Sequence, residues 1–145
     1  MNHHRLAPLQ TVAETREDEA ARKLAEVQRK HADQHARLEE IRCYAAEYAS
    51  APVGATPALL LNRQAFLGKL RDAEHFQLQA VEEARLAVEA ERTVWLLKRR
   101  DVSVLDQLAA CYRLREQRQQ ELRNQRGSDE LALRRFLADR LKDNA

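Results

Sequence analysis

The sequence predicts an all-α protein, an antiparallel two-helix coiled coil (a long helical hairpin) with helices of unequal length, on three grounds. The three prolines stand at positions 8, 52 and 57 and no glycine precedes Gly54, so two long stretches, about residues 9–50 and 58–126, contain no proline and permit an unbroken helix. The composition is typical of long helices, because 33% of the residues are charged and only 5% are aromatic. Apolar residues also recur every seven positions, in alternating steps of three and four.

We expect residues 1–145 to form a single coiled-coil domain. The first helix is predicted over about residues 9–50, the bend over 51–57 and the second helix over about 58–126. The last segment, 127–145, begins with Gly127-Ser128, which can end one helix and cap the next. It is either a separate short helix or a continuation of the second one, and the sequence leaves both open.

The first helix carries two rows of seam residues. One row is Leu24, His31, Leu38 and Ala45, and the other is Ala13, Ala20, Val27, Gln34, Ile41 and Tyr48. His31 and Gln34 are the polar exceptions, and we interpret them as a layer that fixes the register of the helices at some cost in stability.

The second helix has a clear start, since Thr56 can cap it and Pro57 fits the first helical position, where its missing N–H costs nothing. Its first seam row is Leu67, Glu74, Val81, Val88, Trp95, Val102 and Ala109. Its second seam row is Leu70, Gln77, Ala84, Glu91, Lys98, Leu105 and Tyr112.

The difference in length predicts an overhang. If the chain bends near Gly54, the first helix covers the second only to about residue 100. The apolar stripe that continues further is then expected to have no intramolecular partner; it consists of Val102, Leu105, Leu108, Ala109 and Tyr112. Eight basic and four acidic side chains leave residues 98–126 with a net charge of +4. This pattern fits docking on a partner of opposite charge, and also an ordinary solvated helix face.

No group of residues predicts catalysis or a bound cofactor. His31 and His35 share one helical face, but no third ligand converges on them, so we expect no metal site. Three glycines can scarcely build a phosphate-binding loop, and no nucleophile stands beside a base. We therefore expect a protein that is not an enzyme and has no cofactor.

The two cysteines and the hydropathy predict a soluble, cytoplasmic protein. In an antiparallel hairpin Cys43 and Cys111 lie tens of ångströms apart, so they are expected to be reduced thiols. No apolar run is long enough for a signal peptide or a membrane span.

The scarce aromatic residues gather near the bend. Tyr44 and Tyr48 stand near the end of the first helix, and the apolar positions Phe66, Leu70 and Ala73 follow the bend, with Gln77 next in the same pattern. Packing in the seam explains part of this group, above all Leu70 and Tyr48. A narrow hairpin cannot bury the whole group, which favours a protein-binding patch.

These motifs also carry a resemblance. The first helix ends in EIRCYAAEY (residues 40–48), Phe66, Leu70 and Ala73 open the second, and a glutamine- and arginine-rich run ends in Asp129-Glu130. In these features and in the order of its elements, the chain resembles the FliJ family of flagellar export proteins over nearly its whole length. The resemblance implies an antiparallel coiled coil similar to the stalk of the rotary ATPase gamma subunit.

The resemblance also implies partners and a location. Family members act with a hexameric export ATPase, whose pore receives the helix termini, with the cytoplasmic domain of the membrane export gate, and with export chaperones. The protein would then be cytoplasmic and peripherally associated with the export apparatus of the inner membrane. The gate-contacting positions correspond here to Ile41, Tyr44, Tyr48, Phe66, Leu70 and Ala73. The overhang residues expected at the ATPase ring are Leu105, Leu108, Tyr112, Arg113, Arg115 and Arg118.

Two positions depart from the family pattern, because Arg37 stands in place of a glutamine and Gln77 in place of a histidine. Three other interpretations stay open. The chain can be the injectisome counterpart, a spacer that forms homo-oligomers through its exposed stripe, or a nucleic-acid-binding arm with the arginines of residues 98–126. We favour the flagellar interpretation, with no nucleic acid and no direct membrane insertion.

Overall fold

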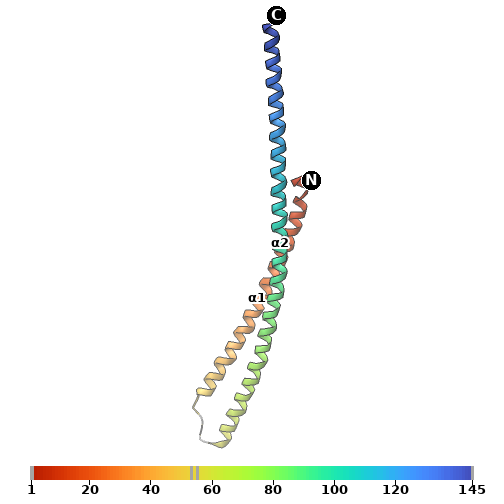
Figure 1. Ribbon diagram of the computed structural model, residues 1–145. Helices are drawn as coiled ribbons and strands as arrows, with labels where there is room; N and C mark the ends of the chain where they lie inside the picture. The colour runs from red at the N-terminus through yellow and green to blue at the C-terminus, as the bar shows by residue number, and fades with distance from the viewer. Residues whose placement is uncertain (1, 53, 55, 145) are drawn as a thin grey trace. The chain divides into compact units, whose positions relative to one another are not determined.

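The computed structural model describes residues 2–52, 54 and 56–144, and the regular structure of these residues is helical. A short 3-10 helix, η1, spans His3–Arg5, α1 spans Ala7–Ser50, and α2 spans Pro57–Asp143. The helices α1 and α2 pack against each other in opposite directions, so the predicted all-α hairpin with unequal helices is confirmed (Figure 1).

The chain divides into two compact units, each built from parts of both α-helices. The unit that contains the bend is Thr15–Arg99, here called the bend half. The other unit consists of residues 2–14 and 100–144 of the described chain, here called the terminal half. In each unit a segment of α1 lies beside a segment of α2.

The start of α2 follows the prediction from Thr56 and Pro57. The Thr56 hydroxyl oxygen accepts the N–H of Leu59 at 3.4 Å, and the Thr56 carbonyl accepts the N–H of Leu60 at 3.2 Å. Thr56 therefore caps the helix, and Pro57 occupies its first position.

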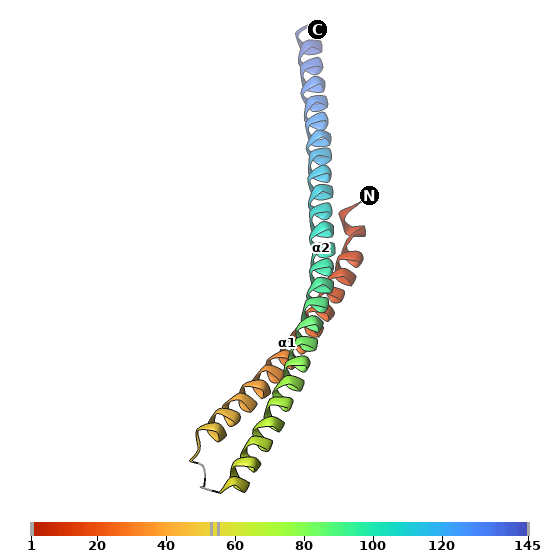
Figure 2. The same cartoon turned by 60° about the horizontal axis from the view of Figure 1, so that its bottom comes forward.

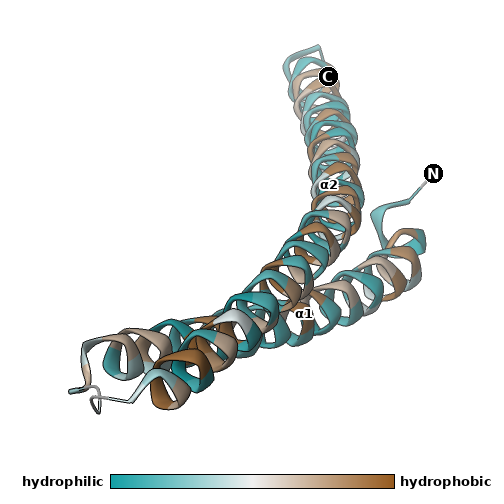
Figure 3. Ribbon diagram, turned by 90° about the horizontal axis from the view of Figure 1, so that it is seen from below, coloured by the Kyte–Doolittle hydropathy of each residue, from teal (hydrophilic) through white to brown (hydrophobic). Residues whose placement is uncertain are grey.

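The predicted seam rows are the residues that the helices turn toward each other. Every predicted seam position of α1 and α2 is buried or half-buried, whereas most neighbouring positions are exposed. The buried side chains among the described residues are few: Leu6, Ala20, Leu24, Leu38 and Ala109. In a two-helix coiled coil each seam residue is covered by one partner helix only, so most seam residues remain partly exposed to solvent. Figure 3 shows hydrophilic and hydrophobic residues alternating along both helices.

In the bend half, facing residues lie further along α2 than a symmetric bend near Gly54 predicts. Gln34 contacts Gln77, where the symmetric bend places about residue 74. The reason is the start of α2: Arg63 is the residue that reaches the last turn of α1, so Pro57 to Asn62 extend past the end of α1. Each later contact is displaced accordingly.

The terminal half corrects the predicted overhang. The N-terminal segment, residues 2–14, lies along α2 (Figure 2). It reaches Glu116, which accepts the backbone N–H of His3. Gln10 donates to Asp106 at 2.9 Å, and Leu6 and Ala109 are both only 2% exposed. The expectation that α2 is uncovered beyond residue 100 is therefore wrong. The displaced register and the residues before position 9 extend the cover.

The uncovered part of α2 begins after Glu116. Residues 117–143 are helical and exposed throughout, and at 1.5 Å per residue they run on for about 40 Å. The helix passes through Gly127 without a break, so residues 127–143 continue α2. Its exposed large apolar side chains here are Leu122, Leu131, Leu133, Phe136, Leu137 and Leu141.

Candidate functional site

An aromatic cluster joins the two helices near the bend. The Tyr48 and Phe66 rings lie 4.5 Å apart between centroids, and the Tyr44 ring meets the edge of Phe66 at 6.0 Å. Tyr48, a seam residue, and Phe66 are half-buried, whereas Tyr44 is 52% exposed. Because Phe66 anchors both tyrosines, the cluster presents aromatic surface to solvent at a fixed place.

The structure places the six predicted gate positions in one region of the bend half. They are Ile41, Tyr44, Tyr48, Phe66, Leu70 and Ala73, and this set is called the bend surface from here on. Ile41 and Leu70 are half-buried seam residues, and Ala73 is exposed. The bend surface thus combines seam residues with exposed ones.

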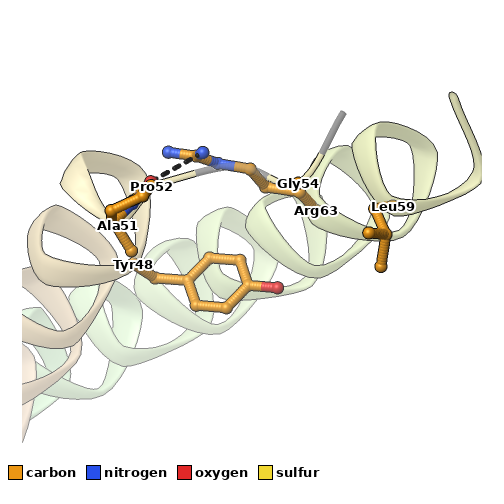
Figure 4. Close-up of a pocket in the computed structure, with 6 residues that line it drawn as sticks. All are labelled: Tyr48, Ala51, Pro52, Gly54, Leu59 and Arg63. Atoms are coloured by element: carbon orange, nitrogen blue, oxygen red, sulfur yellow. Dashed lines mark hydrogen bonds between the residues drawn. The ribbon is translucent and has the colours of Figure 1, made fainter. Parts of the chain in front are cut away.

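Arg63 was not singled out in the sequence, although its side chain connects the start of α2 to the end of α1. Its guanidinium donates to the carbonyl of Ala51 at 2.9 Å and also to the carbonyl of Ala49. Figure 4 shows it reaching from α2 toward the end of α1. Together with Tyr48 and Leu59 it lines a cavity of about 160 Å³. The sequence contained one signal for this interaction. α1 has no basic residue in its last turn, so its terminal carbonyls need a donor from elsewhere.

Polar residues interrupt the seam beyond the bend surface. The Gln77 side-chain amide donates to the side-chain oxygen of Gln34 at 2.6 Å and to its backbone carbonyl at 2.9 Å. Arg42 forms an ion pair with Glu74 at 2.9 Å across the two helices. The predicted polar layer at Gln34 is therefore paired, and Gln77, one of the two departures from the family pattern, is its partner. A satisfied polar pair of this kind is suited to fixing register.

In the terminal half, Glu116 holds the start of the chain. Its carboxylate accepts the backbone N–H of His3 at 3.0 Å and also contacts Nδ1 of the His3 ring. The hydrogen bond from the His3 N–H, followed by those from the side chain, lowers the pKa of Glu116 below its usual value of about 4.5. Neither residue was among the sequence candidates.

The residues predicted at the ATPase ring are only partly free. Leu105 and Tyr112 are half-buried; of the other residues in the same apolar stripe, Val102 is half-buried and Ala109 is buried. Leu108 is 36% exposed, and the remaining three candidates, Arg113, Arg115 and Arg118, are exposed. The Arg115 guanidinium lies over the Tyr112 ring, 5.9 Å from its centroid. The uninterrupted exposed surface is on residues 117–143.

The described part of the chain contains no group of three or more His, Cys, Asp or Glu side chains placed to hold a metal ion. Within the same residues, neither α-helix has a stretch apolar enough to cross a membrane. Cys43 and Cys111 are both free and exposed.

The fold defines the chain as an antiparallel coiled-coil protein. Its two exposed surfaces described above are the bend surface and residues 117–143 of α2. The family model described as "Flagellar FliJ protein" matches residues 1–141. Searches of curated proteins and of solved structures gave no match. Because the family match spans nearly the whole sequence, the chain belongs to the FliJ family and is a component of the flagellar export apparatus.

Proposed function

We propose that this chain is a non-enzymatic adaptor that engages the hexameric export ATPase through its terminal half and the export gate through its bend surface. Membership of the FliJ family over residues 1–141 is the observation that carries the proposal. The protein acts in the cytoplasm, at the inner-membrane export apparatus. It also assists the handling of export chaperones.

The ATPase contact is assigned to α2 beyond the N-terminal segment. Residues 117–143 are exposed on every side, with apolar side chains such as Phe136 and Leu137 between arginines. Arg113 and Arg115 stand just before this stretch and Arg118 at its start. The partly covered Leu105, Leu108 and Tyr112 precede them on the same helix. A basic amphipathic helix suits a pore lined by the opposite charge. Such a contact biases the assembly and turnover of the ring by binding one of its states more tightly.

The gate contact is assigned to the bend surface because aromatic side chains dominate binding hot spots. Tyr44 and Ala73 are exposed, and Phe66 holds the tyrosines in place. Because the rings are already held in place, a partner does not have to order them when it binds. This lowers the entropic cost of association.

The test is a pair of alanine substitutions, Phe66→Ala with Leu70→Ala. We expect at least about a tenfold loss of affinity for the cytoplasmic domain of the gate, measured by calorimetry. Helicity by circular dichroism should change little, because both side chains are only half-buried. The matched control is Leu96→Ala with Leu97→Ala, which removes two exposed leucines of the same half. A rod that melts in the double variant would show that these residues serve packing alone.

One observation favours self-association as a second candidate function. Leu86, Ala90, Val94 and Leu97 are exposed and follow each other at steps of four, four and three along α2. This spacing is that of a helix-packing stripe. Sedimentation equilibrium decides between the candidates, because a monomer at micromolar concentration excludes self-association.

A further inference from the structure

We propose that Arg63 is a positioning residue for the bend surface: its guanidinium closes the C-terminus of α1 and thereby holds Tyr48 against Phe66. The consequence for partner binding rests on the proposed gate contact. The effect of Arg63 on the position of Tyr48 is independent of that proposal.

The first step is that α1 lacks two common means of satisfying the carbonyls at its end, although the Ser50 hydroxyl donates to the carbonyl of Glu47 at 3.1 Å. The final carbonyls of a helix have no intrahelical N–H partner and carry the negative end of the helix dipole. A residue with positive φ often supplies the missing hydrogen bonds, but the described residues contain none. Basic residues in the last turn can do the same, and α1 has none there.

The second step is that Arg63 supplies this cap from the other helix. It donates to the carbonyls of Ala49 and Ala51, which lie at the end of α1 and just after it. The planar guanidinium presents several donors in a fixed fork, so one side chain can serve two carbonyls. Its positive charge also opposes the negative end of the dipole. Arg63 is half-buried, which strengthens both effects relative to a fully solvated side chain.

The third step connects the cap with the aromatic cluster. Arg63 and Phe66 are three residues apart, so they lie on the same face of α2. Arg63 binds the backbone directly after Tyr48, and Phe66 packs on the Tyr48 ring at 4.5 Å. α2 therefore contacts the end of α1 in two adjacent places, through the hydrogen bonds of Arg63 and through the Phe66 ring. Without the hydrogen bonds of Arg63, the last turn of α1 frays and Tyr48 samples other positions.

The experiment compares the free protein carrying Arg63→Ala, Arg63→Lys or the control Arg71→Ala, which removes an exposed arginine of the same helix. With three tyrosines and three phenylalanines, the NMR contact between the Tyr48 and Phe66 rings is assignable. In Arg63→Ala we expect this contact to weaken and the amides of residues 46–50 to exchange about tenfold faster. Lysine should restore part of the effect, because it is a point charge without the fork. Arg71→Ala should match the wild type.

The same variants are then titrated with the cytoplasmic domain of the export gate. Arg63→Ala should bind about fivefold more weakly, Arg63→Lys should fall between, and total helicity should stay within a few per cent of wild type. An unchanged ring contact and unchanged exchange would overturn the proposal. A loosened bend with unchanged affinity would overturn the part that concerns binding. If the wild type itself does not bind the gate domain, the proposed gate contact fails, and the NMR comparison alone still decides whether Arg63 holds Tyr48.

Discussion

Glu116 ties the start of the chain to α2 by the chemistry of its carboxylate. Its carboxylate accepts the His3 N–H and contacts the His3 ring, so the ionised form is favoured in the folded protein. The pKa of Glu116 is accordingly lowered from its usual value of about 4.5. A carboxylate with a lowered pKa contributes stability that is fully present above its unfolded pKa and is lost as the pH falls through the folded value.

We therefore predict that the N-terminal segment detaches from α2 under acid conditions, as the pH falls below about 4.5. Glu116→Gln should remove most of this dependence, because glutamine carries no charge at any pH. The measurement is the NMR shift and exchange rate of the His3 amide between pH 7 and pH 3. Glu121→Gln is the control, since Glu121 is exposed one turn further along. An acid transition that persists unchanged in Glu116→Gln would contradict the assignment.

The helices are held together by a seam that buries few side chains completely. Leu38 is 2% exposed, whereas Leu97, on the outer face of α2, is 55% exposed. Removal of buried methyl groups leaves a cavity, and removal of exposed ones does not.

Leu38→Ala should lower the free energy of unfolding by about 2–3 kcal/mol, measured by urea denaturation. Leu97→Ala should stay within about 0.5 kcal/mol of wild type. Equal losses in both variants would mean that Leu97 is covered in solution, as the self-association candidate requires. In that case the decrease in the free energy of unfolding caused by Leu97→Ala should depend on protein concentration.

α2 carries Gly127 within its exposed stretch, where tertiary packing does not support the helix. An added Cβ at this position meets no atom within 4 Å. Glycine inside a helix costs about 1 kcal/mol relative to alanine. Residues 117–143 depend on this intrinsic preference more than the paired parts do.

Gly127→Ala should therefore slow amide exchange around residue 127 by about fivefold and raise the helical signal. Gly68→Ala is the comparison, because it also has open space but lies in the paired part of α2. There the gain should appear in the global unfolding midpoint. No change in exchange at Gly127→Ala would indicate that this stretch is not held as a helix in solution.

For the chain as a whole, the two proposed contacts occupy separate units and should be separable by truncation. A chain that ends at Glu116 keeps the N-terminal segment on its partner face and loses residues 117–145. We expect it to bind the gate domain as the wild type does and to lose stimulation of ATPase turnover in a steady-state assay.

A shorter chain that ends at Val104 is a useful contrast, because it also removes Ala109 and Glu116. That truncation uncovers Leu6 and should lower stability as well as activity. If the chain ending at Glu116 stimulates the ATPase fully, the assignment of the exposed helix to the ring is wrong.

Much of this architecture follows from local patterns. The seam rows could be predicted from the heptads, because residues that share one face of a helix recur at a fixed spacing along the sequence. Thr56 and Pro57 identified the start of α2 for a similarly local reason, since a cap involves only neighbouring residues. The aromatic cluster was accessible too, because Tyr44, Tyr48 and Phe66 lie close to one bend.

Long-range contacts were not accessible in this way. The register of α1 on α2 depends on where α1 ends relative to Arg63, and a shift of a few residues there displaces every later pair. That shift brought residues 2–14 over Ala109 and moved the free part of α2 to residue 117.

The amino-acid order alone established two long helices, the faces that they bury and the family to which the chain belongs, because periodicity and motifs are local properties. The folded structure established which residues face each other, that Arg63 caps α1, and that the N-terminal segment covers α2 as far as Glu116. These contacts join residues that are distant in the chain, and their pairing depends on how the two helices are aligned, which no repeat in the sequence encodes.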